Sequence, residues 1–344
     1  MDFNGLTMKI LRTLLYILLA LVLVAVLLSF VGPKSYDVSR TVEINAPTAV
    51  VFPYLKSLKK QNDWGPWKKQ DPEMQVSYEG EDGTVGFVSR WEGEKTGRGE
   101  QRISAIMGTT VETELTFYMP WGASKSTGYM HAADAAGGSE VTWGIRGEND
   151  FIGRIFGVFM NMDKGIGPMF EEGLQSLKQM VESDVNKEYK GYQIRAVDFP
   201  GRQYVSAREK VSMADISTFM GQHFPRITAA LDQANLPMDG APSGLYFSWD
   251  ETSGVTEMAA AIPVKSPVAI PETEMITVAA GKALTIDYYG PYDGLEGAHK
   301  AIDEFAQSTG VKTKVPVIEE YLTDPQTEPD SKKWLTKIYY LLDQ

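Results

Sequence analysis

The sequence predicts an α+β protein that begins with an N-terminal transmembrane helix, continues with a curved antiparallel sheet closed by a long helix, and ends with a duplicated domain. Three observations support this prediction. An uncharged apolar run covers residues 13–31. Alternating, strand-like segments follow and lead into a long amphipathic helical pattern that ends near Asp184. Beyond residue 192, the order strand, helix, strand, strand occurs twice.

The composition is that of a globular protein with a sizeable core. The chain has 344 residues, of which 43% are hydrophobic and 23% charged, so two domains and an appendage are expected. Its net charge of −12 argues against a nucleic-acid partner, because phosphate binding requires a basic surface. An acidic surface suits cationic ligands, although it is also common among soluble proteins.

Residue counts also limit the possible chemistry. The chain has no cysteine, which excludes disulfides, thiolate metal sites and cysteine nucleophiles. The three histidines, His131, His223 and His299, are far apart in the sequence, which argues against a histidine-based zinc site or catalytic triad. We therefore expect neither a metal nor a cofactor.

The apolar run at residues 13–31 is about long enough to cross a bilayer as a helix. Lys9 and Arg12 precede it and Gly32-Pro33-Lys34 ends it. A cleaved signal peptide is the alternative, but the run exceeds a usual signal core and no Ala-x-Ala site follows. We therefore expect residues 1–35 to be a tail and an uncleaved anchor in the lipid bilayer, with the N-terminus inside the cell and the soluble domains outside.

Residues 36–184 are expected to form the first soluble domain. A strand near Val42 and a short helix after Pro47 are followed by segments that read as an antiparallel meander. These segments lie near residues 74–79, 84–91, 99–106, 110–118, 124–133 and 140–146. Phe170, Leu174 and Leu177 then mark the apolar stripe of a long helix, which could close the concave face of the sheet over a cavity.

Five aromatic residues on or beside these strands are candidates for lining that cavity. They are Trp91, Phe117, Trp121, Tyr129 and Trp143. The alternative for each of them is ordinary packing in the core, because large aromatic side chains at strand spacing are commonly core residues.

Three motifs in this part of the chain can be compared with those of known proteins. They are the run Val42–Phe52, the turn Trp64-Gly65-Pro66-Trp67, and Met162-Asp163-Lys164 leading into Phe170–Leu174. With them, residues 36–184 resemble the START-like, or polyketide-cyclase-like (SRPBCC), superfamily. The resemblance implies a helix-grip cavity for a lipid-like or aromatic molecule. It implies no particular reaction, because the superfamily includes binders, transporters and enzymes.

A polar linker at residues 185–191 is expected to lead into a second domain at residues 192–344. Its first repeat comprises a strand at 202–209, a helix at 214–234, and strands at 245–249 and 255–263. Its second repeat comprises a strand at 282–289, a helix at 295–308, and strands at 317–323 and 334–342. Two such units related by a pseudo-twofold axis would create a cleft at their junction.

The strand at 317–323 carries two adjacent acids, Glu319 and Glu320. Strand alternation places Glu319 and Tyr321 on one face and Glu320 on the other, so one carboxylate must point inward. An acid beside an aromatic ring on a half-buried surface suits a lipophilic cation. The alternative is that both acids lie on a solvated edge strand.

The same region contains motifs of a known ligand-binding domain. They are Gly290-Pro291-Tyr292, the run Glu319–Pro325, and the closing strand Leu335–Tyr340. Residues 192–344 thereby resemble the GyrI-like domain, the AraC-type effector-binding fold. The resemblance implies that the acid of a Glu-x-Tyr motif meets cationic or amphipathic ligands. By position this acid is Glu319 and its partner is Tyr321, although a shift of one residue would select Glu320 instead.

Three further aromatic residues are candidates for the same cleft: Tyr246 and Trp249 on the pseudo-equivalent strand, and Tyr289. We therefore predict a membrane-anchored protein that binds or sequesters hydrophobic or cationic amphipathic small molecules in two tandem pockets. One alternative is a hydrolase of electrophilic small molecules, in which Glu319 activates water. Another is a membrane-proximal scaffold for lipids or proteins. Direct DNA contact is not expected, because an anchor and a grip domain stand where relatives carry a helix-turn-helix.

One apolar stretch is left over by these predictions. Residues 151–162 form a run of twelve residues that is too short to span a bilayer. Three interpretations remain open: the run dips into the membrane surface near the anchor, it forms a mobile gate over the grip cavity, or it packs against the sheet.

Overall fold

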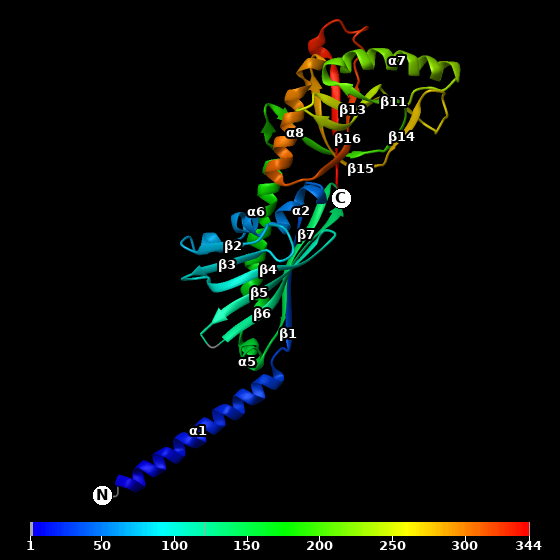
Figure 1. The fold of residues 1–344 in the computed structure, drawn as a ribbon. Helices are drawn as coiled ribbons and strands as arrows, with labels where there is room; N and C mark the ends of the chain where they lie inside the picture. The colour runs from blue at the N-terminus through cyan, green and yellow to red at the C-terminus, as the bar shows by residue number, and fades with distance from the viewer. Residues whose placement is uncertain (1–2, 121, 344) are drawn as a thin grey trace. The chain divides into compact units, whose positions relative to one another are not determined.

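The computed structural model describes residues 3–120 and 122–343, with side chains from residue 11 onward. The chain divides into two compact units, one comprising residues 1–45 and 54–180 and the other comprising residues 46–53 and 181–344 (Figure 1). We describe each unit separately.

The first helix, α1 (Phe3–Val31), is the N-terminal apolar segment. Its part from Leu11 to Val31 is long and apolar enough to cross a membrane, a property that a signal sequence shares. Most of the described side chains in this part are exposed, including Leu21 and Phe30. The predicted apolar helix is therefore present.

The first unit contains, in the described part of the chain, a seven-stranded antiparallel sheet in the order β1-β7-β6-β5-β4-β3-β2. Its strands are β1 (Ser35–Ile44), β2 (Gln75–Glu79), β3 (Val88–Gly93), β4 (Gly97–Met107), β5 (Thr110–Met119), β6 (Gly122–Ala135) and β7 (Gly138–Glu148). Strands β2 to β7 form the predicted meander, and β1 closes it by pairing with β7.

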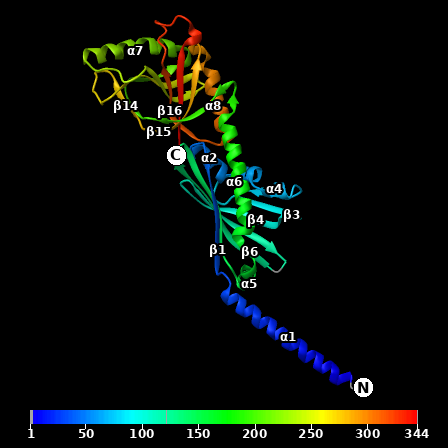
Figure 2. The ribbon, with the colours of Figure 1, turned by 180° about the vertical axis from the view of Figure 1, so that it is seen from behind.

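Between β1 and β2 lie α2 (Thr48–Lys56), most of which belongs to the other unit, α3 (Leu58–Trp64) and α4 (Trp67–Gln70). After β7 come α5 (Phe151–Phe159) and α6 (Met162–Asn186), and α6 covers one face of the sheet. Figures 1 and 2 show α6 running along the sheet. Phe170 of α6 packs on Trp143 of β7 with ring centroids 4.4 Å apart. This arrangement confirms the helix-grip fold predicted from the sequence.

The C-terminal unit has, within residues 181–343, an eight-stranded sheet in the order β10-β15-β17-β16-β12-β13-β11-β14. Its strands are β10 (Arg195–Phe199), β11 (Arg202–Ser212), β12 (Ser243–Asp250), β13 (Val255–Val264), β14 (Glu274–Val278), β15 (Gly281–Tyr289), β16 (Thr313–Tyr321) and β17 (Leu335–Leu342). A separate short ribbon pairs β8 (Glu188–Tyr189) with β9 (Tyr192–Gln193).

The predicted duplication is confirmed. The first repeat is β11-α7-β12-β13, with α7 at Ile216–Gln233, and the second is β15-α8-β16-β17, with α8 at Leu295–Thr309. The two repeats join through the antiparallel pair β12 and β16, whose register places Gly244 opposite Glu319. Equivalent strands of the repeats therefore meet at the centre of the sheet, and the two acids lie on an internal strand.

Two short strands of the eight-stranded sheet were not predicted from the sequence, nor was the ribbon of β8 and β9. β10 precedes the first repeat and pairs with β15 of the second repeat, whereas β14 precedes the second repeat and pairs with β11 of the first. Each spans five residues, too few for a clear alternating pattern, and each is stabilised by pairing with a strand distant in sequence.

Candidate functional site

The buried carboxylate of Glu319 is the centre of the candidate site in the C-terminal unit. Strand alternation turns Glu319 and Tyr321 to the face contacted by α7 and α8, and Glu320 to the other face. Only 5% of the Glu319 surface is exposed. A charged group at such a position requires partners, because burial of an unpaired carboxylate is costly.

Three protein groups supply hydrogen bonds to this carboxylate. The Tyr321 hydroxyl donates to Oε2 over 2.7 Å, and the Tyr246 hydroxyl donates to the same oxygen over 3.1 Å. The other oxygen, Oε1, lies 2.8 Å from Nε2 of His299 on α8. A carboxylate only accepts, so Nε2 carries a proton and donates to it. In the neutral tautomer, Nδ1 of His299 then accepts from the Tyr340 hydroxyl at 3.0 Å.

The tyrosines around Glu319 remain protonated donors. Burial raises the pKa of Tyr246 and Tyr321 well above the ordinary value, and the charge of Glu319 raises the pKa of both further. Burial likewise raises the pKa of Tyr340. The Tyr246 and Tyr321 hydroxyl groups therefore donate hydrogen bonds to the Glu319 carboxylate without bringing a positive charge, and the Tyr340 hydroxyl donates to His299.

Gly244 leaves space for this convergence of side chains. It lies opposite Glu319 in the register of β12 and β16. A Cβ atom at this position would lie 2.8 Å from the Tyr321 hydroxyl and 2.8 Å from Cε of Met220 on α7. Any larger residue would therefore push these groups away from the carboxylate.

Aromatic rings connect the buried acid with the surface. The Tyr321 ring contacts Tyr292 edge-to-face at 5.3 Å, and Tyr292 contacts Trp334 at 5.1 Å. On the other side, the Tyr246 ring contacts Trp249 at 6.0 Å. Tyr292 is 37% exposed and Trp249 is 54% exposed. The arrangement provides apolar area and ring faces beside a carboxylate, which are the contacts that an aromatic cation uses.

The structure brings Glu319, Tyr321 and Tyr246 together, and it places Trp249 against the Tyr246 ring. A bulge between Tyr246 and Ser248 shifts the register of β12, which keeps Trp249 on the face of Glu319. Tyr289 lies elsewhere, because it is 62% exposed and its alternation in β15 turns it to the opposite face.

Sequence reasoning did not identify four residues of this site: Tyr292, Trp334, Tyr340 and His299. Of these, His299 alone bonds directly to Glu319. It contributes both ring nitrogens to the network around Glu319, yet it lies on a helix rather than on the strand with the acid motif. One feature of the sequence could have pointed to His299. It lies beside the apolar stripe of α8, four residues after Leu295 and three before Ile302. That spacing indicates an inward-facing residue, although it does not identify the partner.

The neighbouring acid, Glu320, is equally buried but is neutralised within the protein. Its Oε1 atom accepts from Nη1 of Arg202 over 2.7 Å, and its Oε2 atom accepts from the Tyr339 hydroxyl over 3.3 Å. Burial, with the charge of Glu320, raises the pKa of Tyr339 to about 12. The two adjacent acids thus have different environments on opposite faces of one strand, and neither lies on a solvated edge.

The predicted aromatic residues of the first unit lie in three places. Trp143 is buried between Phe170 and Trp64, whose ring is 5.1 Å away. Trp91 and Phe117, whose ring centroids are 5.7 Å apart, lie on the same face of the sheet as Trp143. Tyr129 lies on the opposite face because of strand alternation, and its hydroxyl donates to Asp37 over 2.6 Å. Trp121 lies outside the described residues.

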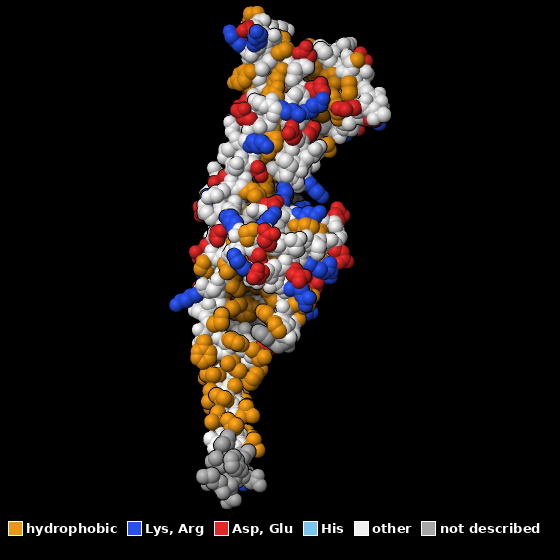
Figure 3. Space-filling model, turned by 90° about the vertical axis from the view of Figure 1, so that its left-hand side faces the viewer, with side chains coloured by type: hydrophobic (Ala, Val, Ile, Leu, Met, Phe, Trp, Pro, Cys, Tyr) orange, Lys and Arg blue, Asp and Glu red, His pale blue; other side chains and the backbone are white. Residues whose placement is uncertain are grey.

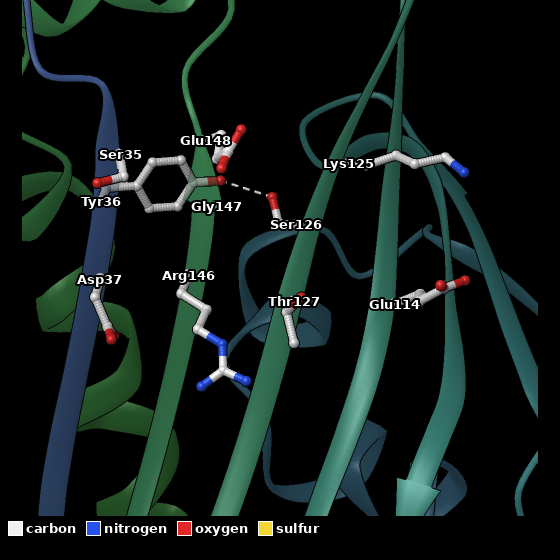
Figure 4. Close-up of a pocket in the computed structure, with 10 residues that line it drawn as sticks. All are labelled: Ser35, Tyr36, Asp37, Glu114, Lys125, Ser126, Thr127, Arg146, Gly147 and Glu148. Carbon is white, nitrogen blue, oxygen red and sulfur yellow. Dashed lines mark hydrogen bonds between the residues drawn. The ribbon is translucent and has the colours of Figure 1, made fainter.

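A pocket with a volume of about 660 Å³ lies at one end of β1, β5, β6 and β7 (Figure 4). Tyr36 reaches across Gly147 and its hydroxyl lies 2.6 Å from Oγ of Ser126. Charged side chains of both signs line the pocket, including Glu114, Lys125 and Arg146. None of the described aromatic candidates lines it, so this pocket was not predicted from the sequence.

Among the described residues, no group of three or more His, Asp or Glu side chains is placed to hold a metal ion. The arrangement around Glu319 is a buried acidic group surrounded by aromatic side chains in a duplicated α+β domain, next in sequence to a helix-grip domain. Residues 192–342 match the family described as GyrI-like small molecule binding domain, and residues 35–182 match the family described as polyketide cyclase / dehydrase and lipid transport. The chain thus combines the two kinds of domain that the sequence motifs indicate.

Solved structures with similar parts show low sequence identity. The C-terminal domain of EcmrR is 20% identical, with 44% of this chain and 98% of that chain covered and a TM-score of 0.41. SAV2435 bound to tetraphenylphosphonium is 17% identical, with coverage of 44% and 93% and a TM-score of 0.34. CV1439 from Chromobacterium violaceum is 16% identical, with coverage of 44% and 99% and a TM-score of 0.32. Among curated proteins, none matches this chain significantly.

Proposed function

We propose that this protein is a membrane-anchored binder of hydrophobic, cationic small molecules, for which Glu319 is the counter-ion. The observation that carries the proposal is a carboxylate that is 5% exposed and satisfied by hydroxyl groups and an imidazole. No lysine or arginine of the described chain forms an ion pair with it. A bound cation would supply the missing positive charge in a partly dry site.

Glu320 provides the internal comparison that supports this proposal. It has the same exposed fraction as Glu319, but Arg202 neutralises it. The protein therefore pairs one buried acid with an arginine, whereas the other meets an imidazole and two hydroxyl groups and, among the described residues, no lysine or arginine. The aromatic rings of Tyr292, Trp334 and Trp249 favour a ligand cation with a large apolar surface.

A comparison of charged and neutral ligands tests the role of charge. Titration of a soluble fragment that starts at Tyr36 with tetraphenylphosphonium is expected to change the intrinsic Trp and Tyr fluorescence. Triphenylphosphine oxide, which is aromatic but uncharged, is expected to bind at least about tenfold more weakly, a difference of about 1.4 kcal/mol. Glu319→Gln should remove most of this preference. Equal affinity for both ligands in the unmodified fragment would contradict the proposal.

The proposal includes the anchor and the two soluble domains. The span from Leu11 to Val31 supports single-pass anchoring in the cell membrane. We propose that the N-terminus is inside the cell, and that residues 36–184 and 192–344 are outside, joined by residues 185–191. External protease added to intact cells should then remove the soluble domains. Full protection in intact cells, with digestion after lysis, would show the opposite orientation.

A second candidate function is supported by His299. Its Nε2 atom lies 2.8 Å from Glu319, so the site contains a carboxylate and imidazole pair that could relay a proton from water to an electrophilic ligand. If the protein is a hydrolase, mass spectrometry should detect turnover of a reactive ligand, and both Glu319→Gln and His299→Gln should abolish it. Binding without conversion would exclude this second function for the ligand tested.

A further inference from the structure

The short helix α5 has an unusual surface for a helix outside the span. Every side chain in it is described and none is buried. Phe151 is 51% exposed, Phe156 is 54% exposed and Phe159 is 72% exposed. Arg154 provides the helix with its one charged side chain, and the remaining residues are apolar or glycine. Exposed phenylalanines gathered on one short helix usually mark an interaction surface.

This helix gains little from packing against the rest of its unit. Helices of about nine residues are marginal in water, and most depend on burying an apolar face. The side chain of Asp150 stabilises the start of α5 by accepting from the Gly153 amide over 2.7 Å. The rings of Phe151, Phe156 and Phe159 nevertheless remain more than half exposed, so burial within the protein does not account for this apolar surface.

Close backbone contacts hold α5 at the end of α1. A Cβ atom at Gly32 would lie 2.0 Å from the Arg154 carbonyl oxygen, and one at Gly157 would lie 2.6 Å from the Pro33 ring. The side chain of Asn149 also donates to the Pro33 carbonyl over 2.9 Å. These contacts place α5 beside the residues at which the candidate membrane span ends at Val31.

We propose that α5 lies in the interface of the lipid bilayer, with Phe156, Phe159 and neighbouring apolar side chains inserted among the lipids. The inference rests on the proposed anchoring by α1. An interfacial helix buries its apolar face about 5–10 Å into the boundary between headgroups and acyl chains. Figure 3 shows hydrophobic side chains that continue from α1 onto the adjoining surface of the first unit. Lys34, exposed just after the span, lies where a long basic side chain can reach the lipid headgroups.

The position of α5 also explains how the first unit meets the membrane. Ser35 and Glu148 line the pocket at the ends of β1 and β7. Ser35 follows Val31, the last residue of α1, by four residues, and Glu148 precedes Phe151, the first residue of α5, by three. The pocket therefore lies within about 14 Å of α1 and about 11 Å of α5 along the chain. A ligand leaving the bilayer surface would therefore meet this end of the sheet first.

Single spin labels measure the depth of α5 directly, because the chain has no native cysteine. Full-length protein is placed in nanodiscs of phosphatidylcholine with phosphatidylglycerol. Nitroxides are attached to Phe159→Cys on α5, to Leu21→Cys in α1 and to Met107→Cys, a comparably exposed apolar residue that is 57% exposed. Collision rates with oxygen, which partitions into lipid, and with a water-soluble nickel chelate then report the depth of each label.

The label at position 159 should collide more with oxygen than with the chelate, at a depth between those of the labels at 21 and 107. If the labels at 159 and 107 are equally accessible to the chelate while the label at 21 lies in the bilayer, the inference is overturned and the anchor stands. If the label at 21 is also exposed to water, the anchor itself fails and the inference fails with it.

Discussion

Two adjacent glutamates have different partners because a strand turns neighbouring side chains to opposite faces. Glu319 receives hydrogen bonds from Tyr246, Tyr321 and His299, whereas Glu320 forms an ion pair with Arg202. Both acids have an exposed fraction of 5%, so burial alone does not distinguish them. The difference is the arginine that pairs with Glu320, and it is the basis of our proposal that Glu319 binds the ligand.

Removal of one of the tyrosine hydroxyl groups should destabilise the fold, because the buried Glu319 carboxylate then lacks a hydrogen-bond donor. Tyr321→Phe is expected to lower the free energy of unfolding by about 1–3 kcal/mol, because it removes a hydrogen bond to a buried charge. Tyr246→Phe should cost less, because its bond is longer, at 3.1 Å. Urea denaturation of the soluble fragment measures both changes. A Tyr321→Phe variant as stable as the parent would contradict the assigned hydrogen bond.

The ion pair on the opposite face should matter for stability and not for binding. Arg202→Met leaves the buried Glu320 without its cation. The free energy of unfolding should fall by up to about 3 kcal/mol, because the arginine is partly exposed and solvent screens the pair. The affinity for an aromatic cation should change less than about threefold, because the pair lies on the other face of β16. A large loss of affinity in a folded variant would place Glu320 in the ligand site.

The buried tyrosines also predict how stability depends on pH. The pKa values of Tyr246 and Tyr321 are raised in the folded state above the ordinary value near 10. Their contribution to stability is therefore complete below about pH 10 and is lost as the pH rises further, because the unfolded chain then releases protons that the folded chain retains. Denaturation midpoints between pH 8 and pH 11 measure this loss, which should be smaller in a Tyr246→Phe, Tyr321→Phe double variant.

At the scale of elements, the central pair of β12 and β16 holds the site together. Its register places Gly244 opposite Glu319. Helix α8 contributes His299 at the carboxylate, and α7 contributes Phe224 against the Tyr321 ring and Met220 beside Gly244. The site is thus assembled from both repeats. A change at the junction between the repeats should therefore affect the site more than a similar change elsewhere in the sheet.

Substitution of one glycine tests this view of the junction. Gly244→Ala should destabilise the protein by about 1–3 kcal/mol, because the added methyl group would overlap the Tyr321 hydroxyl and Met220. Gly281→Ala on β15 is the matched control, since a Cβ atom there meets nothing within 4 Å. Thermal unfolding compares the two variants. Equal melting temperatures would mean that the junction adapts without cost.

Several elements could be predicted from the sequence because their signals are local. The apolar stripe of α6, the meander and the repeated order of strands and helices all depend on spacing along the chain. Alternation and repeat equivalence also suffice to group Glu319, Tyr321 and Tyr246. His299 could not be assigned in this way, because its contact with Glu319 depends on how α8 packs on the sheet. Tyr289 and Tyr129 were assigned to the two predicted sites for their aromatic character, but both lie on the opposite face of their sheet. Aromatic character alone does not reveal which face a strand residue occupies.

At the scale of the whole molecule, the chain joins an apolar N-terminal helix to two small-molecule-binding types of domain. The proposed function assigns a task to each part: the helix keeps the protein at the membrane, the surface of α5 adds a second lipid contact, and Glu319 receives a cationic ligand.

The central claim is that Glu319, and not its neighbour, is the counter-ion of a ligand. Isothermal titration of tetraphenylphosphonium into the parent fragment and its Glu319→Gln and Glu320→Gln variants tests it most directly, with circular dichroism to confirm folding. The account predicts that Glu319→Gln weakens binding by more than about tenfold, or 1.4 kcal/mol, and that Glu320→Gln changes it by less than about threefold. Equal affinities for the parent and Glu319→Gln, or a larger loss in Glu320→Gln, would contradict the account.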